Sequence, residues 1–166
     1  MYDEQYRRVQ SRLWDSGEKM FCDGLKPDGS VVRRFSIHSQ ALAIMCGLKE
    51  KYHEHMITKR LRPYLRGRRV ASAMPSSYWV TYVYEVMTQW GHGNDVLEHI
   101  KKNWEPMIPF GGCWEVFDGL LEEGQTGGIG HTTTSHAWAA HPIFHFVRTL
   151  GGLSQSEIAW KHIRFA

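Results

Sequence analysis

The sequence has few cysteines and no long apolar run, and both absences narrow the classes of protein it can be. Its 166 residues include three cysteines and no Cys-x-x-Cys pair, so neither a disulfide framework nor a zinc ribbon is expected. Free thiols favour a reducing compartment such as the cytoplasm. The longest apolar run, from Ala41 to Cys46, is far shorter than the ~20 residues of a membrane-spanning helix. We therefore expect no membrane partner, and the first residues show no apolar signal-peptide core.

Acidic residues are absent from one stretch, positions 59 to 69, which contains six basic residues. The remainder of the chain has 14 basic and 17 acidic residues, although the formal net charge is +3. The basic stretch is either a solvated helix end and loop or a phosphate-binding patch, and its local character favours the first. We therefore expect no nucleic-acid partner. The length and the 42% hydrophobic content fit one packed domain.

Apolar residues recur at helical spacing in six segments, which we expect to be helices: 4–20, 38–48, 51–65, 77–90, 94–105 and 135–150. The first, third and fifth segments have one apolar stripe, whereas the other three are apolar on nearly every face. This alternation predicts outer helices with one wet side and inner helices covered all round. Asn94 is the expected N-cap of the fifth helix, and Pro142 is expected to kink the sixth.

The connections support this two-layer arrangement. Links from an inner helix to the next outer helix are short, whereas links from an outer helix to the next inner helix are long. If neighbouring helices pack antiparallel, every long loop lies at the end where the inner helices begin. Each inner helix also opens with capping residues followed by a ring, at His38, Tyr78 and His136. These features predict an all-α fold of about three helical hairpins in an α/α toroid.

The candidate chemistry lies in the third long loop and at the start of the last helix. Glu115 follows Trp114, and His136 and Trp138 come after a Gly- and Thr-rich stretch. Aromatic faces stack on sugar rings while carboxylates and imidazoles bind hydroxyls, so this set suits a carbohydrate. The alternative is that both tryptophans belong to the core and Glu115 caps a helix.

Several motifs resemble, in order, the C-terminal half of the catalytic domain of bacterial α-L-rhamnosidases. They are Asp23-Gly24, His38-Ser39-Gln40-Ala41-Leu42-Ala43, Gly47-Leu48, Trp104-x-x-Met107, Trp114-Glu115 and Ser135-His136-Ala137-Trp138-x-Ala140-His141-Pro142. The tail from Leu150 to Arg164 is similar to that family's passage into a C-terminal β-domain.

The resemblance implies half of a six-hairpin (α/α) toroid over residues 1–153. Residues 154–166 would then form a linker and the first strand of a truncated β-domain. It also implies inverting hydrolysis of terminal α-L-rhamnosides, with Glu115 as general base and a rhamnose-containing carbohydrate as partner. His136 and Trp138, together with Trp114, His38 and Asp118, would shape the sugar site.

An inverting glycosidase also needs a carboxylic acid, about 6.5–9.5 Å from the base. In the family this acid lies on the N-terminal half of the barrel, which this chain lacks, so the isolated chain is expected to be inactive. Asp23, Asp28 and Asp118 are the substitutes on the same face, with Asp28 in a turn and Asp118 a support for Glu115. The alternative function is a non-catalytic sugar- or protein-binding remnant. Half a toroid would also expose its inner helices, so the missing half or a second copy is an expected partner.

Two pairs of histidines have a spacing typical of metal ligands, namely His53 with His55 and His141 with His145. The second pair would share one helix face, but no glutamate follows His141 in the zinc-protease pattern. We interpret all four as core or subsite histidines, and we expect neither a metal nor another cofactor.

Overall fold

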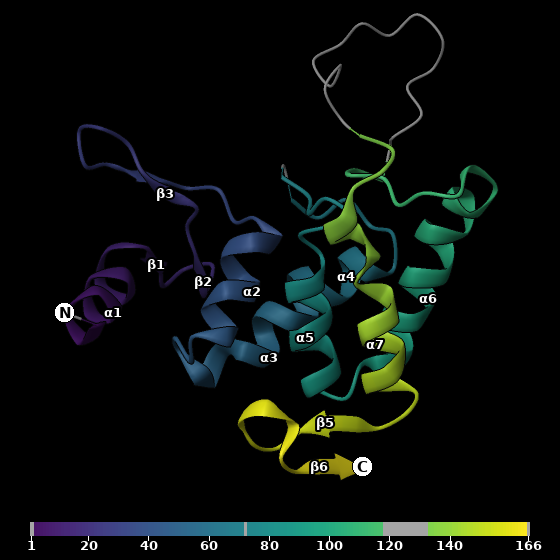
Figure 1. Cartoon of the computed structure of the whole chain (residues 1–166). Coiled ribbons are helices and arrows are strands. Elements are labelled where there is room, and N and C mark those ends of the chain that lie inside the picture. Colours follow the sequence, from purple (N-terminus) through teal and green to yellow (C-terminus); the bar gives the residue numbers. More distant parts are fainter. Residues whose placement is uncertain (1, 72, 118–132, 166) are drawn as a thin grey trace, which may run out of the picture.

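A computed structural model describes residues 2–71, 73–117 and 133–165 of the chain (Figure 1). Helices form most of it: α1 (Tyr2–Arg12), α2 (Ile37–Met45), α3 (His53–Met56), α4 (Arg62–Leu65), α5 (Thr81–Gln89), α6 (Gly93–Trp104) and α7 (Pro142–Thr149). Antiparallel hairpins pair β1 (Trp14–Asp15) with β2 (Met20–Phe21), β3 (Gly24–Leu25) with β4 (Val31–Val32), and β5 (Leu153–Gln155) with β6 (Ile163–Phe165). The all-α prediction therefore holds for the body of the molecule and omits these short hairpins.

The first helix is shorter than predicted, because it ends at Arg12 and the chain continues into the β1–β2 hairpin. The Asp15 carboxylate accepts the backbone N–H groups of Gly17 and Glu18, both at 3.0 Å, which fixes the turn. Trp14 leaves the helical path to stack on Tyr52, with ring centroids 4.9 Å apart. A contact between distant segments thus overrides the helical pattern after Arg12.

The other predicted helices are present, but several of their ends differ from the prediction: α2 ends at Met45 and α5 begins only at Thr81. The segment predicted as 51–65 is a continuous helical run, with a 3₁₀ turn (Glu50–Tyr52), α3, a π-helical turn (Ile57–Leu61) and α4. Asn94 is not the N-cap of α6, because that helix begins at Gly93 after His92. Pro142 separates a 3₁₀ turn (Ala137–Ala140) from α7 and occupies the first turn of α7, where its missing N–H costs nothing.

The inner helices α2, α5 and α7 run side by side and begin at the same end of the molecule (Figure 1). The outer layer consists of α1, the 50–65 segment and α6, and α6 packs on both α5 and α7. The described parts of the long connections lie at the end where the inner helices begin, as the sequence predicts. The core between the layers includes Ile37, Ile57, Val83, Val86 and Ile100. In the part of the chain described, no helix is long and apolar enough to cross a bilayer.

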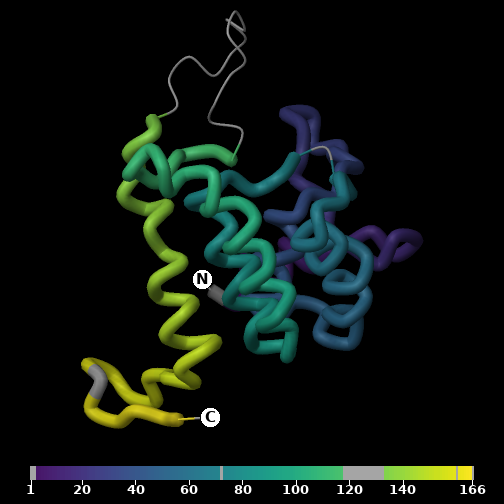
Figure 2. Tube along the Cα trace, turned by 90° about the vertical axis from the view of Figure 1, so that its right-hand side faces the viewer, coloured from purple at the N-terminus to yellow at the C-terminus, as the bar shows by residue number. Residues whose placement is uncertain are grey.

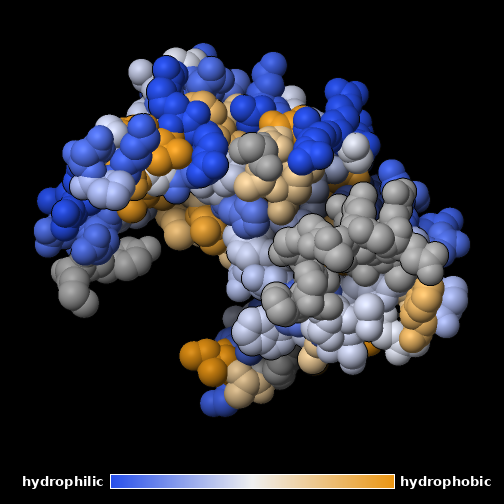
Figure 3. All heavy atoms as spheres, turned by 90° about the horizontal axis from the view of Figure 1, so that it is seen from above, coloured by the Kyte–Doolittle hydropathy of each residue, from blue (hydrophilic) through white to orange (hydrophobic). Residues whose placement is uncertain are grey.

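The inner helices are not covered on every side, as expected of half a toroid and contrary to what their all-round apolar pattern alone predicts. Leu42 and Met45 of α2 remain 46% and 47% exposed, and Phe144 of α7 is 46% exposed. Seen from above, the molecule is a crescent with apolar atoms along its hollow side (Figure 3). The β5–β6 hairpin lies below the lower end of α7 (Figure 2), so the tail forms two paired strands where one was expected.

Candidate functional site

The starts of the three inner helices meet on one face of the molecule. The turn that precedes α5 contributes two adjacent rings, Tyr78 and Trp79. The Tyr78 ring lies 5.2 Å from the ring of His136, before α7, and the Trp79 ring lies 4.2 Å from that of His38 in α2. The positions that the sequence picks out as a weak repeat therefore come together in space.

Tyr78, His136 and Trp138 form one aromatic group, here called the Tyr78 cluster. The Trp138 ring lies 6.1 Å from each of the other two rings, and Trp138 is 73% exposed. Within the described residues, Nε2 of His136 is buried and has no hydrogen-bond partner. An indole open to solvent beside a tyrosine and an imidazole is a surface on which a sugar ring can stack.

A short backbone pairing holds Glu115 next to this cluster. The Glu115 N–H donates to the carbonyl of Thr133 at 2.9 Å, and the His136 N–H donates to the carbonyl of Cys113 at 2.7 Å. The Thr133 N–H in turn donates to Oε2 of Glu115 at 3.2 Å. Residues 113–115 and 133–136 thus lie alongside each other, which brings the predicted base and the predicted imidazole together.

Trp114, the residue before Glu115, belongs to the hydrophobic core. It is only 4% exposed, its N–H donates to the sulfur of Met107 at 3.3 Å, and its carbonyl accepts the buried hydroxyl of Ser77. Both of these bonds involve the backbone of Trp114, and its indole Nε1 has no hydrogen-bond partner among the described residues. Its ring meets that of Phe110 edge-on, 5.4 Å away. Burial leaves almost none of this ring for a ligand, so Trp114 positions Glu115, and Trp138 is the exposed indole.

His38 belongs to a second group with Trp79 and Tyr82, here called the His38 cluster. Trp79 lies 5.1 Å from Tyr82, a half-exposed ring on α5. Burial lowers the pKa of His38, and the nearby Asp23 carboxylate partly offsets this. The imidazole is therefore neutral at pH 7 and has one donor and one acceptor nitrogen. Sequence reasoning missed Trp79 and Tyr82, although Trp79 directly follows the repeat position Tyr78.

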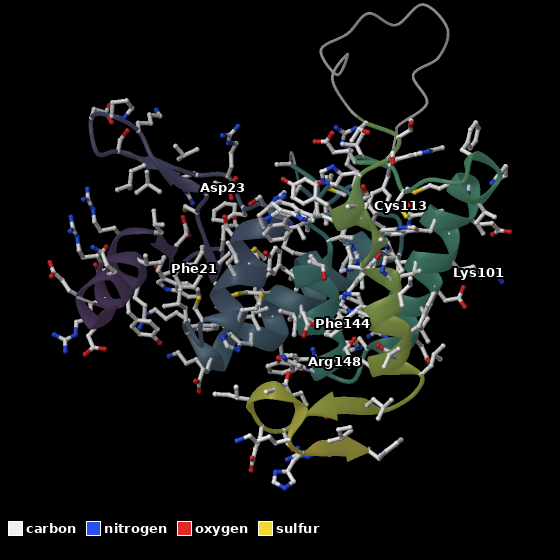
Figure 4. The ribbon with its side chains drawn as sticks, in the orientation of Figure 1. Phe21, Asp23, Lys101, Cys113, Phe144 and Arg148 are labelled. Atoms are coloured by element: carbon white, nitrogen blue, oxygen red, sulfur yellow. The ribbon has the colours of Figure 1, made fainter. Side chains whose placement is uncertain are left out.

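The two described aspartates that are candidates for the general acid both accept hydrogen bonds from nearby serines. Asp23 lies at the upper end of the molecule (Figure 4), where its carboxylate accepts the Ser36 N–H and the Ser39 hydroxyl, both at 2.8 Å. These bonds support the start of α2. Asp28 accepts both the hydroxyl and the N–H of Ser30, and these bonds lower its pKa, so it is a poor proton donor at neutral pH. Asp118 lies outside the described residues.

The four histidines at metal-ligand spacing each bond to the protein. His53 bonds to the Leu48 carbonyl at 2.8 Å and His55 to the Glu18 carbonyl at 3.1 Å. His141 bonds to the Ser77 carbonyl at 2.7 Å and His145 to the Thr81 hydroxyl at 3.0 Å. Within the described ranges, no three possible ligands gather around one point.

The architecture is compatible with part of a helical toroid, since successive helical hairpins place their inner helices side by side around a hollow. Among solved structures, the chain is similar to the crystal structure of a GH78 family rhamnosidase of Bacillus sp. GL1, with a TM-score of 0.74 and 21% sequence identity. The similarity covers 98% of this chain and 17% of that protein, so this chain spans about a sixth of its length. This likeness shows the fold. No protein-family model matches the sequence, and no curated protein does.

Proposed function

We propose that the chain is glycoside hydrolase-like and that its upper face binds a rhamnose-containing carbohydrate. The supporting observation is the convergence of Glu115 with an exposed tryptophan, a tyrosine and a histidine at the helix starts, in a fold similar to a rhamnosidase. Trp138 would stack on the apolar face of the sugar. His136 and His38 would bind its hydroxyls, and Trp114 would position Glu115.

In this proposal Glu115 is the general base of an inverting reaction. The carboxylate would take a proton from a water molecule as that water attacks the anomeric carbon, while a separate acid protonates the leaving oxygen. Neither Asp23 nor Asp28 is free for the second role, since both carboxylates accept hydrogen bonds that hold local backbone. Asp118, the remaining candidate, lies outside the described residues, so a test of the base should use a leaving group that needs no protonation.

An aryl α-L-rhamnoside with a dinitrophenolate leaving group tests the base, because this anion departs without an acid. We expect slow rhamnose release by the chain and a roughly 100-fold loss in Glu115→Gln, as expected on removal of a general base. Glu105→Gln, at an exposed glutamate on the preceding 3₁₀ turn, is the control and should keep the activity. Equal release by the chain and Glu115→Gln would exclude Glu115 as the base.

The engaged aspartates also favour a second candidate, a non-catalytic module of the same fold that binds sugar or a protein partner. Calorimetry with rhamnose separates a sugar-binding module from a protein-binding one, because the first gives heat without hydrolysis and the second gives none.

The exposed apolar side of α2 and α7 fits the expectation of a covering partner. We propose that further hairpins of a barrel or a second copy of the chain cover it, and sedimentation at rising concentration distinguishes the two.

A further inference from the structure

A pocket of about 500 Å³ opens on the outer layer, between α4, α6 and the segment that follows Trp114. No residue of the Tyr78 cluster or the His38 cluster lines it, and neither does Glu115. It lies at the end of the basic stretch 59–69, a feature that the carbohydrate site does not use. The pocket is therefore separate from the site described above.

Two cations lie at this pocket, Arg69 from the loop after α4 and Lys102 from α6. Nζ of Lys102 lies 3.2 Å from the point that a Cβ on Gly67 would occupy, so the absence of a side chain at Gly67 lets the ammonium reach the pocket. All the lining residues belong to the described part of the chain, and none is acidic. Among the described lining residues, nothing neutralises the positive charge of Arg69 and Lys102.

Two other arginines of the basic stretch, unlike Arg69, already form ion pairs within the protein. Arg62 and Arg66 both pair with Asp95, at 2.8 Å and 2.9 Å, and so form part of the packing between α4 and α6. Among the ion pairs of the described residues, none involves Arg69 or Lys102. Within the basic stretch, Arg62 and Arg66 are thus structural, whereas Arg69 remains available to a ligand together with Lys102 of α6.

The floor of the pocket is aromatic and uncharged. Tyr64 and His99 are both 5% exposed, and their rings lie 5.2 Å apart. The Phe117 ring meets that of His99 edge-on at 5.6 Å. Nδ1 of His99 bonds to the Tyr84 hydroxyl at 2.6 Å, and burial lowers the pKa of His99 to about 4, so its ring is neutral at pH 7.

We propose that this pocket, here called the Arg69–Lys102 pocket, binds a small anionic molecule. Its phosphate or carboxylate group would pair with Arg69 and Lys102. Its flat apolar body would pack on the partly exposed side chains of Phe117 and Met74, which line the pocket beside the buried rings. Arginine and lysine provide the charge-assisted hydrogen bonds that such anions require. This inference does not rest on the proposed carbohydrate site.

Calorimetry with phenyl phosphate, benzoate and inorganic phosphate tests the pocket, and the first two probes separate a phosphate from a carboxylate ligand. We expect saturable binding of phenyl phosphate or benzoate, weaker binding of inorganic phosphate, and a loss of roughly 10-fold or more in affinity for both Arg69→Gln and Lys102→Gln. Lys101→Gln is the matched control, since Lys101 is the adjacent lysine on α6, is exposed and does not line the pocket (Figure 4). It should bind as the unsubstituted chain does.

Three results would overturn the proposal. One is the absence of saturable binding for all three probes by a folded chain. Another is an equal loss of affinity in Lys101→Gln, which would mean a general charge effect. The third is tighter binding of a mixed-sequence oligonucleotide, weakened alike in all three variants, which would indicate a nucleic-acid surface. Trp138→Ala should leave phenyl phosphate binding unchanged, so failure of this pocket and failure of the carbohydrate site are distinguishable.

Discussion

Gln40 shows how one buried polar residue joins distant parts of this fold. Its side chain is fully buried in α2, where Oε1 accepts the Phe21 N–H at 2.9 Å and Nε2 donates to the Phe21 carbonyl at 2.8 Å. The Gln40 side chain thus makes the two hydrogen bonds to the β2 backbone that a neighbouring strand would otherwise make. Phe21 contributes its ring to the core, so Gln40 fixes the β1–β2 hairpin against the inner layer.

Replacing Gln40 by Ala would leave the Phe21 N–H and carbonyl buried without partners. We expect a loss of about 3 kcal/mol in the free energy of unfolding, because each orphaned group costs roughly 1–3 kcal/mol. Urea unfolding followed by circular dichroism measures it. Gln89→Ala, at an exposed glutamine on α5, is the control, and a Gln40→Ala variant as stable as that control would contradict the role of Gln40.

At the scale of elements, the pairing of residues 113–115 with 133–136 positions Glu115, and the preceding residue, Gly112, lies close to the backbone of Thr134. A Cβ on Gly112 would lie 2.5 Å from the Thr134 carbonyl oxygen, which is backbone and cannot rotate aside. Only a residue without a side chain fits at this approach.

Gly112→Ala should push the two segments apart and weaken the bond from the Glu115 N–H to Thr133. We expect the amide protons of Glu115 and His136 to exchange with solvent roughly 5-fold faster or more, since each loses about 1 kcal/mol or more of local stability. Hydrogen exchange followed by NMR measures this directly. Gly24→Ala, where a Cβ would meet no atom within 4 Å, serves as the control. Unchanged exchange in Gly112→Ala would show that the pairing tolerates the added methyl group.

The sequence predicted which helices form better than it predicted where they end or how deeply individual aromatic side chains are buried. Helical periodicity and loop lengths were enough to indicate the two layers and the shared end of the long loops. They failed after Arg12, where Trp14 packs on Tyr52, a contact between segments far apart in the chain. Trp114 and Trp138 looked alike in sequence, because the burial of Trp114 depends on contacts with residues distant from it, such as the bond from the Ser77 hydroxyl to its carbonyl.

At the scale of the whole molecule, stability depends on histidines that are kept neutral between α5, α6 and α7. Burial lowers the pKa of His99 to about 4 and that of His145 to about 3, and nearby positive charges act in the same direction. In the unfolded chain both return to the ordinary value of 6.5. The unfolded state therefore binds more protons below pH 6.5, and folding stability falls as the pH drops from 6.5 towards 4 and then 3.

The free energy of unfolding should therefore be lower at pH 5 than at pH 7, by roughly 2–4 kcal/mol. Urea titrations at the two pH values measure the difference. His145→Gln should reduce it, whereas His162→Gln, at an exposed position, should leave it unchanged. Equal stability at pH 5 and pH 7 would mean that these imidazoles are solvated in the folded chain.

The most direct test of the proposed carbohydrate site is the binding of rhamnose, measured by calorimetry with the chain and two tryptophan variants. Trp138→Ala removes the exposed ring of the Tyr78 cluster, and Trp90→Ala removes an exposed ring just after the end of α5, opposite to the end where the inner helices begin. We predict saturable binding that falls roughly 10-fold in Trp138→Ala, the loss expected for one stacking contact, and is unchanged in Trp90→Ala. No binding by the folded chain, or equal binding by all three proteins, would contradict a sugar site on this face.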